Sequence, residues 1–335
     1  MDKLTKLVWY GCYKDSWRGR IVPESMQHTA KMAYGLLQRL IKHGVAEQWW
    51  KAGDTILDPF GGIGSTSMIA MQSGLNTVLI ELEEYWKNWA EYNINYYQGR
   101  FPGTEHKVIH GDSRQAYSIV SQAINSIITF PPFTPVSKPA SQGEGAAARK
   151  YTLETLHAHD PRNIARLNII TSPPYGNRVD KHGKDKPEYA GTVEKLGKYG
   201  DTPGQIGNLD EGETYWESIH TILEQCQMLM EKDAVLCWVV KSFTRNKKIV
   251  DVPQMSFDLL IQMGFTPIVW IDAMQVANAA QSALIQEPVD TLVKGRLISR
   301  TIGPTRKSYK HVFRRRAEAQ GSTPIDNEVV IVVRK

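Results

Sequence analysis

Cysteine is scarce in this chain of 335 residues, which contains only Cys12, Cys226 and Cys237. Three widely spaced cysteines, an odd number, exclude a disulfide framework and indicate a reducing compartment, so we expect a cytoplasmic protein. The chain has no CxxC pair, and His157 and His159 have no partner ligands nearby in the sequence, so we expect no metal. No stretch approaches the about 20 apolar residues of a membrane span, and the first residues lack the pattern of a secretory signal. We therefore expect no membrane contact.

The turn after the apolar run at 55–57 is the most informative local feature. Glycines at 61, 62 and 64 let the backbone turn sharply and approach a ligand, because no Cβ is in the way. Ser65 and Thr66 follow where a helix would need an N-terminal cap. This succession of strand, glycine turn and helix predicts a nucleotide-like cofactor in a parallel α/β sheet. The predicted cofactor-binding residues are Asp58, Pro59, Phe60, Gly61, Gly62, Gly64, Ser65 and Thr66.

Two further predicted strands end in acidic residues. Glu81 follows the apolar run at 77–80, about 20 residues beyond the glycines, which is the usual distance to a carboxylate that binds a ribose. Asp112 and Ser113 follow the run at 107–110. We expect these residues and the glycine turn to form one pocket. The same spacing suits NAD, so the glycine turn alone does not identify the cofactor.

A second motif lies at 170–175, where an apolar strand leads into Ser172, Pro173, Pro174 and Tyr175. Prolines fix φ and remove backbone donors, which leaves a stiff loop with acceptors facing inward. Ser172 and the Pro173 carbonyl can accept the hydrogens of an exocyclic amino group, and Tyr175 offers a π-face to a flipped base. The ordinary alternative is a proline turn at the end of a strand.

The chain carries an imperfect copy of this motif at 126–133, which reads Ser-Ile-Ile-Thr-Phe-Pro-Pro-Phe. Its distance from Asp112 suits the fourth strand of the sheet. Phe130 stands where the other copy has Ser172, and a phenylalanine side chain accepts no hydrogen bond. Ser172 is therefore the better chemical candidate, while Phe133 is a candidate for lining the base pocket. The sequence does not decide which copy occupies the fourth strand.

Together, the glycine turn and the proline motif resemble the cofactor and catalytic motifs of the S-adenosylmethionine-dependent DNA amino-methyltransferases of phages and bacteria. Those enzymes methylate N4 of cytosine or N6 of adenine. The resemblance implies S-adenosyl-L-methionine as cofactor, double-stranded DNA as partner, and a bacterial or phage-infected cytoplasm. It also implies that Ser172, Pro173, Pro174 and Tyr175 are catalytic. Serine at position 172 favours cytosine N4 over adenine N6.

The resemblance extends over nearly the whole chain, including the segment at 199–207. It implies a Rossmann-like class I methyltransferase fold with a seven-stranded, mostly parallel sheet and an antiparallel last strand at 329–333. It further implies a single catalytic domain over residues 1–335, with an inserted loop at 134–167. We expect a monomer or a weak homodimer.

Near the N-terminus, residues 26–41 are predicted to be helical. The segment with His28 and Lys31 looks like the one that closes over the methionine end of the cofactor in these enzymes, although they usually have proline where Thr29 stands. This resemblance implies that His28 and Lys31 bind the cofactor, with Lys31 pairing with its carboxylate. The alternative for Lys31 is a solvated surface lysine.

Residues 291–317 contain nine basic residues and no acidic residue, whereas the whole chain has a net charge of only +5. Such a stripe can neutralise backbone phosphates while interleaved aromatics stack. A solvated basic face is the ordinary alternative. Because a base-modifying motif is also present, we interpret 275–317 as a DNA-recognition region. The predicted nucleic-acid contacts are Lys307, Lys310, Arg314, Arg315 and Arg316.

Two other functions fit parts of the sequence. Some RNA methyltransferases also pair a glycine motif with a proline-aromatic strand end, although they commonly carry an added RNA-binding domain that is not evident here. A catalytically inactive nucleic-acid-binding relative would keep the same fold. The intact motif at 172–175 argues against decay, and the imperfect copy at 130–133 leaves this alternative open.

Overall fold

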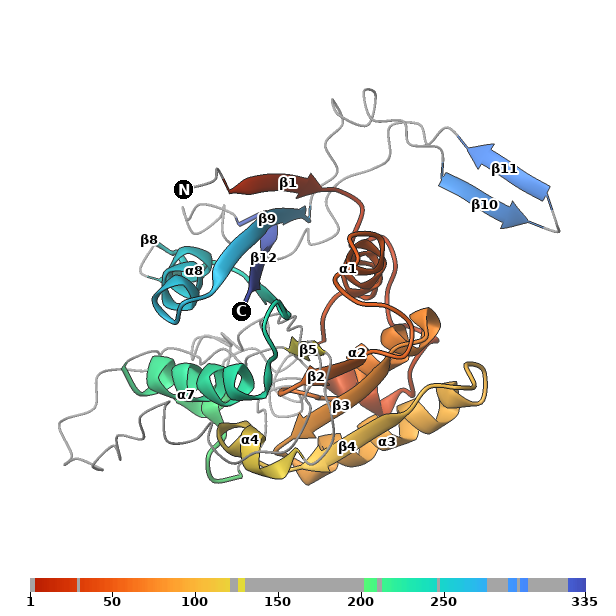
Figure 1. Cartoon of the computed structure of the whole chain (residues 1–335). Coiled ribbons are helices and arrows are strands. Elements are labelled where there is room, and N and C mark those ends of the chain that lie inside the picture. The colour runs from red at the N-terminus through yellow and green to blue at the C-terminus, as the bar shows by residue number, and fades with distance from the viewer. Residues whose placement is uncertain are drawn as a thin grey trace, which may run out of the picture.

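The computed structural model describes residues 4–28, 31–120, 126–129, 202–209, 213–245, 248–275, 289–293, 296–300 and 325–335. In these residues, helices cover both faces of one mixed sheet (Figure 1). The α-helices are α1 (Tyr34–Ala46), α2 (Ser65–Ala70), α3 (Glu84–Gln98), α4 (Ala116–Ile119), α7 (Glu213–Leu229) and α8 (Val252–Gln262). The short 3-10 helices are η1 (Glu24–Gln27), η2 (Met71–Ser73), η3 (Ser113–Gln115) and η6 (Ile206–Asn208).

The main sheet has eight strands within the described residues. Their order is β1 (Thr5–Trp9), β9 (Thr266–Met274), β12 (Asn327–Arg334), β6 (Val235–Val240), β5 (Ser126–Thr129), β2 (Thr55–Asp58), β3 (Asn76–Glu81) and β4 (His106–His110). β12 runs antiparallel to β6 and β9, and the other neighbours run parallel. The predicted antiparallel last strand is confirmed, but the predicted number of seven is one too few. The additional strand is β1, which pairs with the edge of β9.

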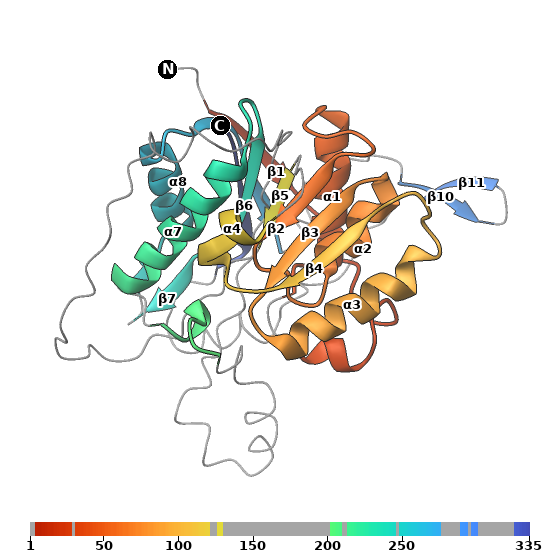
Figure 2. The same ribbon diagram turned by 60° about the horizontal axis from the view of Figure 1, so that its bottom comes forward.

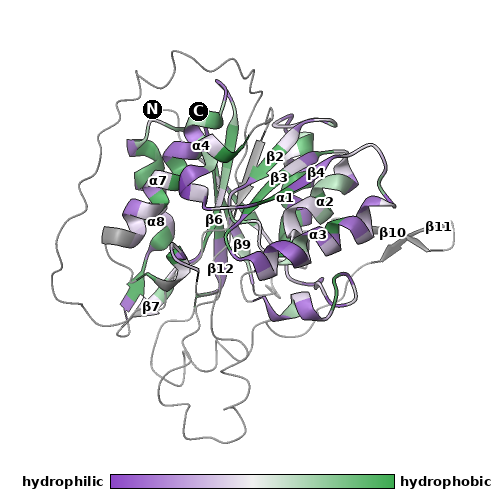
Figure 3. Ribbon diagram, turned by 90° about the horizontal axis from the view of Figure 1, so that it is seen from below, coloured by the Kyte–Doolittle hydropathy of each residue, from purple (hydrophilic) through white to green (hydrophobic). Residues whose placement is uncertain are grey.

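Two hydrophobic cores flank the sheet because its central strands are apolar on both faces. In β6, the odd-numbered residues from Val235 to Val239 pack in the core of α1 and α2, and the even-numbered ones from Leu236 to Val240 pack in the core of α7 and α8. Figure 2 shows α7 and α8 grouped apart from α1, α2 and α3. The hydrophobic colour of β2 and β6 between these groups is visible in Figure 3.

Three local features differ from the predictions. The helix predicted over 26–41 is wrong at its start, because η1 ends at Gln27, His28 is extended with a ψ of 122°, and α1 begins only at Tyr34. A hairpin of β7 (Phe243–Arg245) and β8 (Lys248–Val250) was not predicted, nor was one of β10 (Val289–Val293) and β11 (Arg296–Arg300). The inserted loop at 134–167 lies outside the described residues, as does most of 275–317.

Candidate cofactor site

The carboxyl end of β2 lies where the order of the sheet reverses. β2 pairs with β3 on one side and with β5 on the other, and the chain reaches β5 only after β3 and β4. In open α/β sheets, ligands bind at such a point, outside the carboxyl ends of the strands. Asp58 is the last residue of β2, so the predicted glycine turn begins at the expected position for a ligand site.

Asp58 holds the start of this turn. Its buried carboxylate accepts a hydrogen bond from the backbone N–H of Phe60 at 3.0 Å and another from the hydroxyl of Thr66 at 2.6 Å. The N-cap of α2 is Gly64, with no hydrogen bond from a side chain. The predicted capping of this helix by Ser65 or Thr66 is therefore wrong. Thr66 instead braces the carboxylate that shapes the turn.

The glycines of the turn meet different constraints. Gly62 and Gly64 have φ values of +50° and +82°, in the left-handed region that favours glycine. A Cβ at Gly61 would lie 2.8 Å from the Cβ of Leu79 in β3, and one at Gly62 would lie 3.1 Å from Cε1 of His28. The turn is thus packed between β3 and His28 with no room for side chains.

Glu81, the last residue of β3, ties the turn to the neighbouring strand. One carboxylate oxygen accepts a hydrogen bond from the backbone N–H of Gly62 at 2.7 Å, and the other accepts one from the backbone N–H of Glu83 at 2.9 Å. Burial nevertheless raises the pKa of Glu81 to about 7, against the lowering effect of these two donors. The side chain can therefore change its charge near neutral pH.

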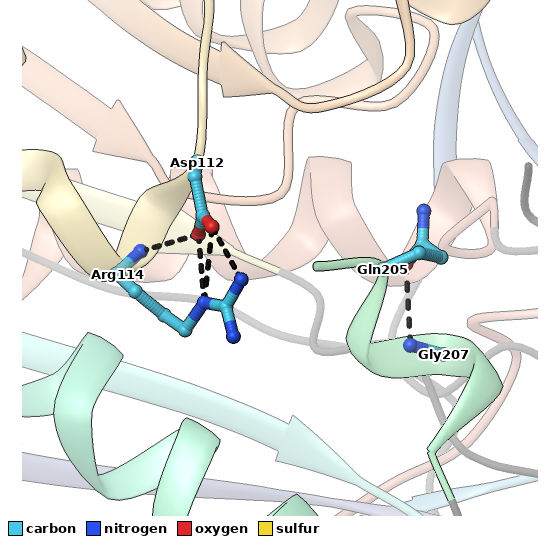
Figure 4. Close-up of polar contacts among 4 residues, drawn as sticks. All are labelled: Asp112, Arg114, Gln205 and Gly207. Carbon is cyan, nitrogen blue, oxygen red and sulfur yellow. Dashed lines mark hydrogen bonds and ion pairs between the residues drawn. The ribbon is translucent and has the colours of Figure 1, made fainter. Parts of the chain in front are cut away.

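Asp112 and Ser113 complete this edge of the site after β4. Arg114 pairs with the Asp112 carboxylate, with 2.5 Å between Nη2 and Oδ2, and its backbone N–H donates to the same carboxylate at 2.9 Å (Figure 4). The hydroxyl of Ser113 donates to the carbonyl of Pro59 in the glycine turn. The ends of β2 and β4 are thereby linked across β3.

His28 closes the site from the N-terminal segment. Its ring is buried and meets Trp86 of α3 edge to face, with 4.6 Å between ring centroids. Burial lowers the pKa of His28 to about 3, so the imidazole is neutral at physiological pH. Among the described residues, its Nδ1 has no hydrogen-bond partner. A buried polar atom in this state fits a site whose ligand supplies the partner.

Lys31 lies beside His28, and its predicted pairing with the carboxylate of the cofactor stays a prediction. Its ammonium donates to the carbonyl oxygen of Met26 at 2.8 Å and also to that of His28. Burial lowers the pKa of Lys31 to about 8. Lys31 is not a lining residue of the cavity. It instead holds the backbone that carries His28.

These elements enclose one cavity. The predicted residues among its lining are His28, Pro59, Phe60, Gly62, Glu81, Asp112 and Ser113. The other predicted residues of the glycine turn do not line the cavity but shape the turn. They are Asp58, Gly61, Gly64, Ser65 and Thr66. The sequence did not predict the other lining residues, which are Ile80, Leu82, Trp86, Gly204, Gln205, Ile206 and Ile222. The predicted residues are thus gathered in one place, while their binding of a cofactor stays a prediction.

The two proline motifs lie outside the described residues, both 130–133 and 171–175. The strand that leads into the first one is described. β5 ends at Thr129 and lies between β2 and β6, so it is the fourth strand when the core strands are counted along the chain from β2. The copy with Phe130 therefore follows that strand directly. The basic residues from Lys307 to Arg316 also lie outside the described residues.

No group of three or more His, Cys, Asp or Glu residues in the described ranges is placed to hold a metal ion. No helix in those ranges is long and apolar enough to cross a membrane. Cys12, Cys226 and Cys237 are buried free thiols, and burial raises the pKa of Cys12 to about 11. They pack as small hydrophobic side chains.

The first quarter of the chain matches a known protein family. Residues 2–91 match the model of a DNA methylase family, the N6/N4 methyltransferases. This range contains His28, the glycine turn and Glu81. No curated protein matches the chain.

Solved structures resemble the chain only distantly. A candidate RNA methyltransferase from Pyrococcus horikoshii has 9% identity and a TM-score of 0.41, over 91% of this chain and 87% of that one. A SAM-dependent methyltransferase from Archaeoglobus fulgidus has 11% identity and a TM-score of 0.36, over 90% of this chain and 94% of that one. A precorrin-6y C5,15-methyltransferase from Geobacter metallireducens has 6% identity and a TM-score of 0.40, over 94% of this chain and 98% of that one. We therefore base the function on the cavity and the family match.

Proposed function

We propose that the chain is an S-adenosylmethionine-dependent methyltransferase that methylates an exocyclic amino group of a base in double-stranded DNA. Cytosine N4 is the preferred target, ahead of adenine N6. The observation that carries the proposal is the cavity at the end of β2, built by His28, the glycine turn and Glu81 within a segment that matches a DNA methylase family.

The residues of the cavity fit the parts of this cofactor. Glu81 offers a carboxylate of the kind that accepts hydrogen bonds from ribose hydroxyls. Ile80, Leu82 and Ile206 supply apolar surface of the kind that an adenine ring packs against. Nδ1 of His28, which has no hydrogen-bond partner in the part of the chain that the structure describes, offers a polar contact. The glycine turn lets the backbone come close to the ligand.

When bound, S-adenosylmethionine supplies a methyl group on a positively charged sulfur. A base amino group is a poor nucleophile because its lone pair is delocalised into the ring. The chain must therefore hold this nitrogen in line with the methyl carbon and stabilise its developing positive charge. We assign Ser172 and the carbonyl of Pro173 to the amino hydrogens, Pro174 to the stiffness of the loop, and Tyr175 to stacking on the base.

The position of β5 supports a role for the proline motif at 130–133 as well. β5, the strand that this motif follows in the sequence, lies between β2 and β6. Phe130 offers no acceptor, so we keep the chemical step at Ser172 and give Phe133 a place in the wall of the base pocket.

The DNA would be held by the basic stripe rather than by the cavity. We propose that Lys307, Lys310, Arg314, Arg315 and Arg316 contact backbone phosphates, because clustered cations without amide side chains favour contacts that do not depend on sequence. The cytoplasm of a bacterial or phage-infected cell, and a monomer or weak homodimer, remain part of this proposal.

The test is incubation of the protein with labelled S-adenosylmethionine and duplex DNA, followed by mass spectrometry of the nucleosides. We expect N4-methylcytosine. N6-methyladenine would overturn the choice of base and keep the class of reaction. Methylation of RNA alone under matched conditions would overturn DNA as substrate. Failure of the protein to bind the cofactor would overturn the proposal that it is a methyltransferase.

A further inference from the structure

A buried carboxylate next to the cofactor cavity holds a segment from far along the chain. Glu83 is only 8% exposed. One of its oxygens accepts a hydrogen bond from the hydroxyl of Thr202 at 2.7 Å. The other accepts from the side-chain amide of Gln205 at 3.0 Å and from the backbone N–H of Thr202 at 3.4 Å. These bonds join positions about 120 residues apart, so they fix tertiary structure rather than a local turn.

The segment 202–209 is also fixed by its own geometry. Gly204 has a φ of +98°, and a Cβ at this residue would lie 3.1 Å from Oδ2 of Asp112 and 2.3 Å from Nη2 of Arg114. The backbone of the segment therefore lies directly on the Asp112–Arg114 ion pair. Ile206 is buried in the core that α7 shares. In Figure 4 the segment carrying Gln205 is seen beside this ion pair.

Two acidic residues accept hydrogen bonds from two segments that line the cavity. Glu81 accepts hydrogen bonds from the glycine turn, and Glu83, two residues later, accepts them from the segment 202–209. The backbone N–H of Glu83 donates to Glu81 at 2.9 Å. Leu82 lies between them and lines the cavity together with Gly204, Gln205 and Ile206. A displacement of either segment would be transmitted through these three residues.

We propose that Glu83 is a positioning residue of the cofactor site, which holds the segment 202–209 in place as part of the cavity wall. The inference rests on the proposed function, because it takes the ligand to be S-adenosylmethionine. Loss of the Glu83 contacts weakens cofactor binding.

The experiment is a double-mutant cycle of Glu83→Gln and Thr202→Val in the full chain, with the affinity for S-adenosylmethionine measured by calorimetry. Glutamine has the shape of glutamate but carries no charge and keeps only one acceptor oxygen, so the three hydrogen bonds that Glu83 accepts are weakened. We expect each single variant to bind about tenfold more weakly, equivalent to about 1.4 kcal/mol. The double variant should bind no more weakly than the weaker single variant, because both changes break the same contact.

A matched control is Glu91→Gln, since Glu91 is a more exposed carboxylate on α3 that pairs with Lys87. It should leave the affinity unchanged. If the wild type binds the cofactor and Glu83→Gln binds it equally well while only its melting temperature falls, Glu83 is structural and the inference is wrong. If the wild type binds no cofactor, the proposed function itself fails. If Glu83→Gln does not fold, Thr202→Val and Gln205→Leu test the same hydrogen bonds from the side of the segment 202–209. Unchanged affinity for the cofactor in both variants would overturn the inference.

Discussion

Tyr13 donates its hydroxyl hydrogen to a carboxylate oxygen of Glu328 at 2.7 Å, although the two residues are 315 positions apart. Glu328 is only 1% exposed, and its other oxygen accepts from the side-chain amide of Gln275 at 2.8 Å. Gln275 in turn accepts from the ammonium of Lys241 at 2.7 Å. Tyr13, Lys241 and Gln275 come after β1, β6 and β9, and Glu328 lies at the start of β12. The four residues therefore meet at the carboxyl ends of the parallel strands, the end of the sheet where the ligand site lies. The network joins the N-terminal segment to the C-terminal strand.

Replacing Tyr13 by phenylalanine should destabilise the fold and leave the cofactor site intact. The change deprives the buried Glu328 carboxylate of one donor, and such a loss costs about 1–3 kcal/mol. Urea unfolding followed by tryptophan fluorescence measures the effect. Tyr92→Phe is the control, because Tyr92 is 54% exposed and should lose almost nothing. An unchanged free energy of unfolding in Tyr13→Phe would show that this hydrogen bond does not stabilise the fold.

Gly62→Val should abolish binding of S-adenosylmethionine, with affinity falling by more than about tenfold. A side chain at Gly62 meets the ring of His28 and requires an L-residue at a φ of +50°, which costs about 1–2 kcal/mol. Calorimetry measures the binding, and circular dichroism checks that the fold survives. Gly99→Ala is the matched control, since a Cβ at Gly99 meets nothing within 4 Å. Unchanged affinity in Gly62→Val would remove the glycine turn from the site.

Binding of the cofactor should strengthen as the pH rises through about 7, the pKa of Glu81. A carboxylate accepts hydrogen bonds from both ribose hydroxyls only when it is ionised. If only that form binds, affinity rises roughly tenfold between pH 6 and pH 8. His28, with a pKa of about 3, stays neutral throughout, whereas Lys31, with a pKa of about 8, begins to lose its charge near the upper end. Glu81→Gln should flatten the profile of cofactor affinity against pH, whereas Lys31→Arg should preserve it.

The same pKa shift has the opposite effect on the stability of the protein without ligand. The pKa of Glu81 is raised in the folded state from 4.5 to about 7, so the folded state holds the proton more tightly than the unfolded chain does. The contribution of Glu81 to stability is therefore complete below about pH 4.5 and is lost as the pH rises through about 7. Melting temperatures of wild type and Glu81→Gln should differ in their pH dependence over this window, and parallel curves would contradict the shift.

The strands around the cavity could be predicted from sequence because their signals are local. β3 and β6 are continuous apolar runs buried on both faces. β1 was missed because Trp9 is its only buried residue and an edge strand needs no apolar run. The start of α1 was placed too early because no local signal indicated that the chain stays extended at His28.

Within the site, the sequence indicated the local geometry of the glycine turn because one short motif carries it, while the binding of a cofactor there stays a prediction. Prediction failed where residues distant in sequence meet. Glu83 and Gln205 are 122 positions apart, and neither belongs to a pattern that points to the other. Trp86, in the first turn of α3, was not predicted to be part of the site, yet it lines the cavity and also packs against the core that contains α1 and α2. The single available signal was its position five residues after Glu81.

Neutralising Arg314, Arg315 and Arg316 by glutamine should weaken binding to all DNA sequences alike. Each phosphate contact that is lost lowers the number of released counterions, so the slope of log K against log salt should flatten by about 0.9 per contact. Fluorescence anisotropy with two unrelated duplexes over a range of salt concentrations measures both effects. Loss of binding to one target sequence alone would show that these arginines read bases. Affinity for S-adenosylmethionine serves as the control and should not change.

Ser172→Ala should lower turnover on DNA much more than it lowers affinity for the cofactor. The serine oxygen is assigned to the amino group of the base, whose hydrogens become better donors as the new C–N bond forms, so the contact is stronger in the transition state. Single-turnover methylation, with binding of cofactor and DNA measured separately, distinguishes kcat from affinity. Phe130→Leu is the matched change in the other proline motif and should be tolerated better if its strand still packs. Full activity in Ser172→Ala would move the catalytic step to the motif that follows Thr129 in the sequence, after the strand β5 that pairs with β2.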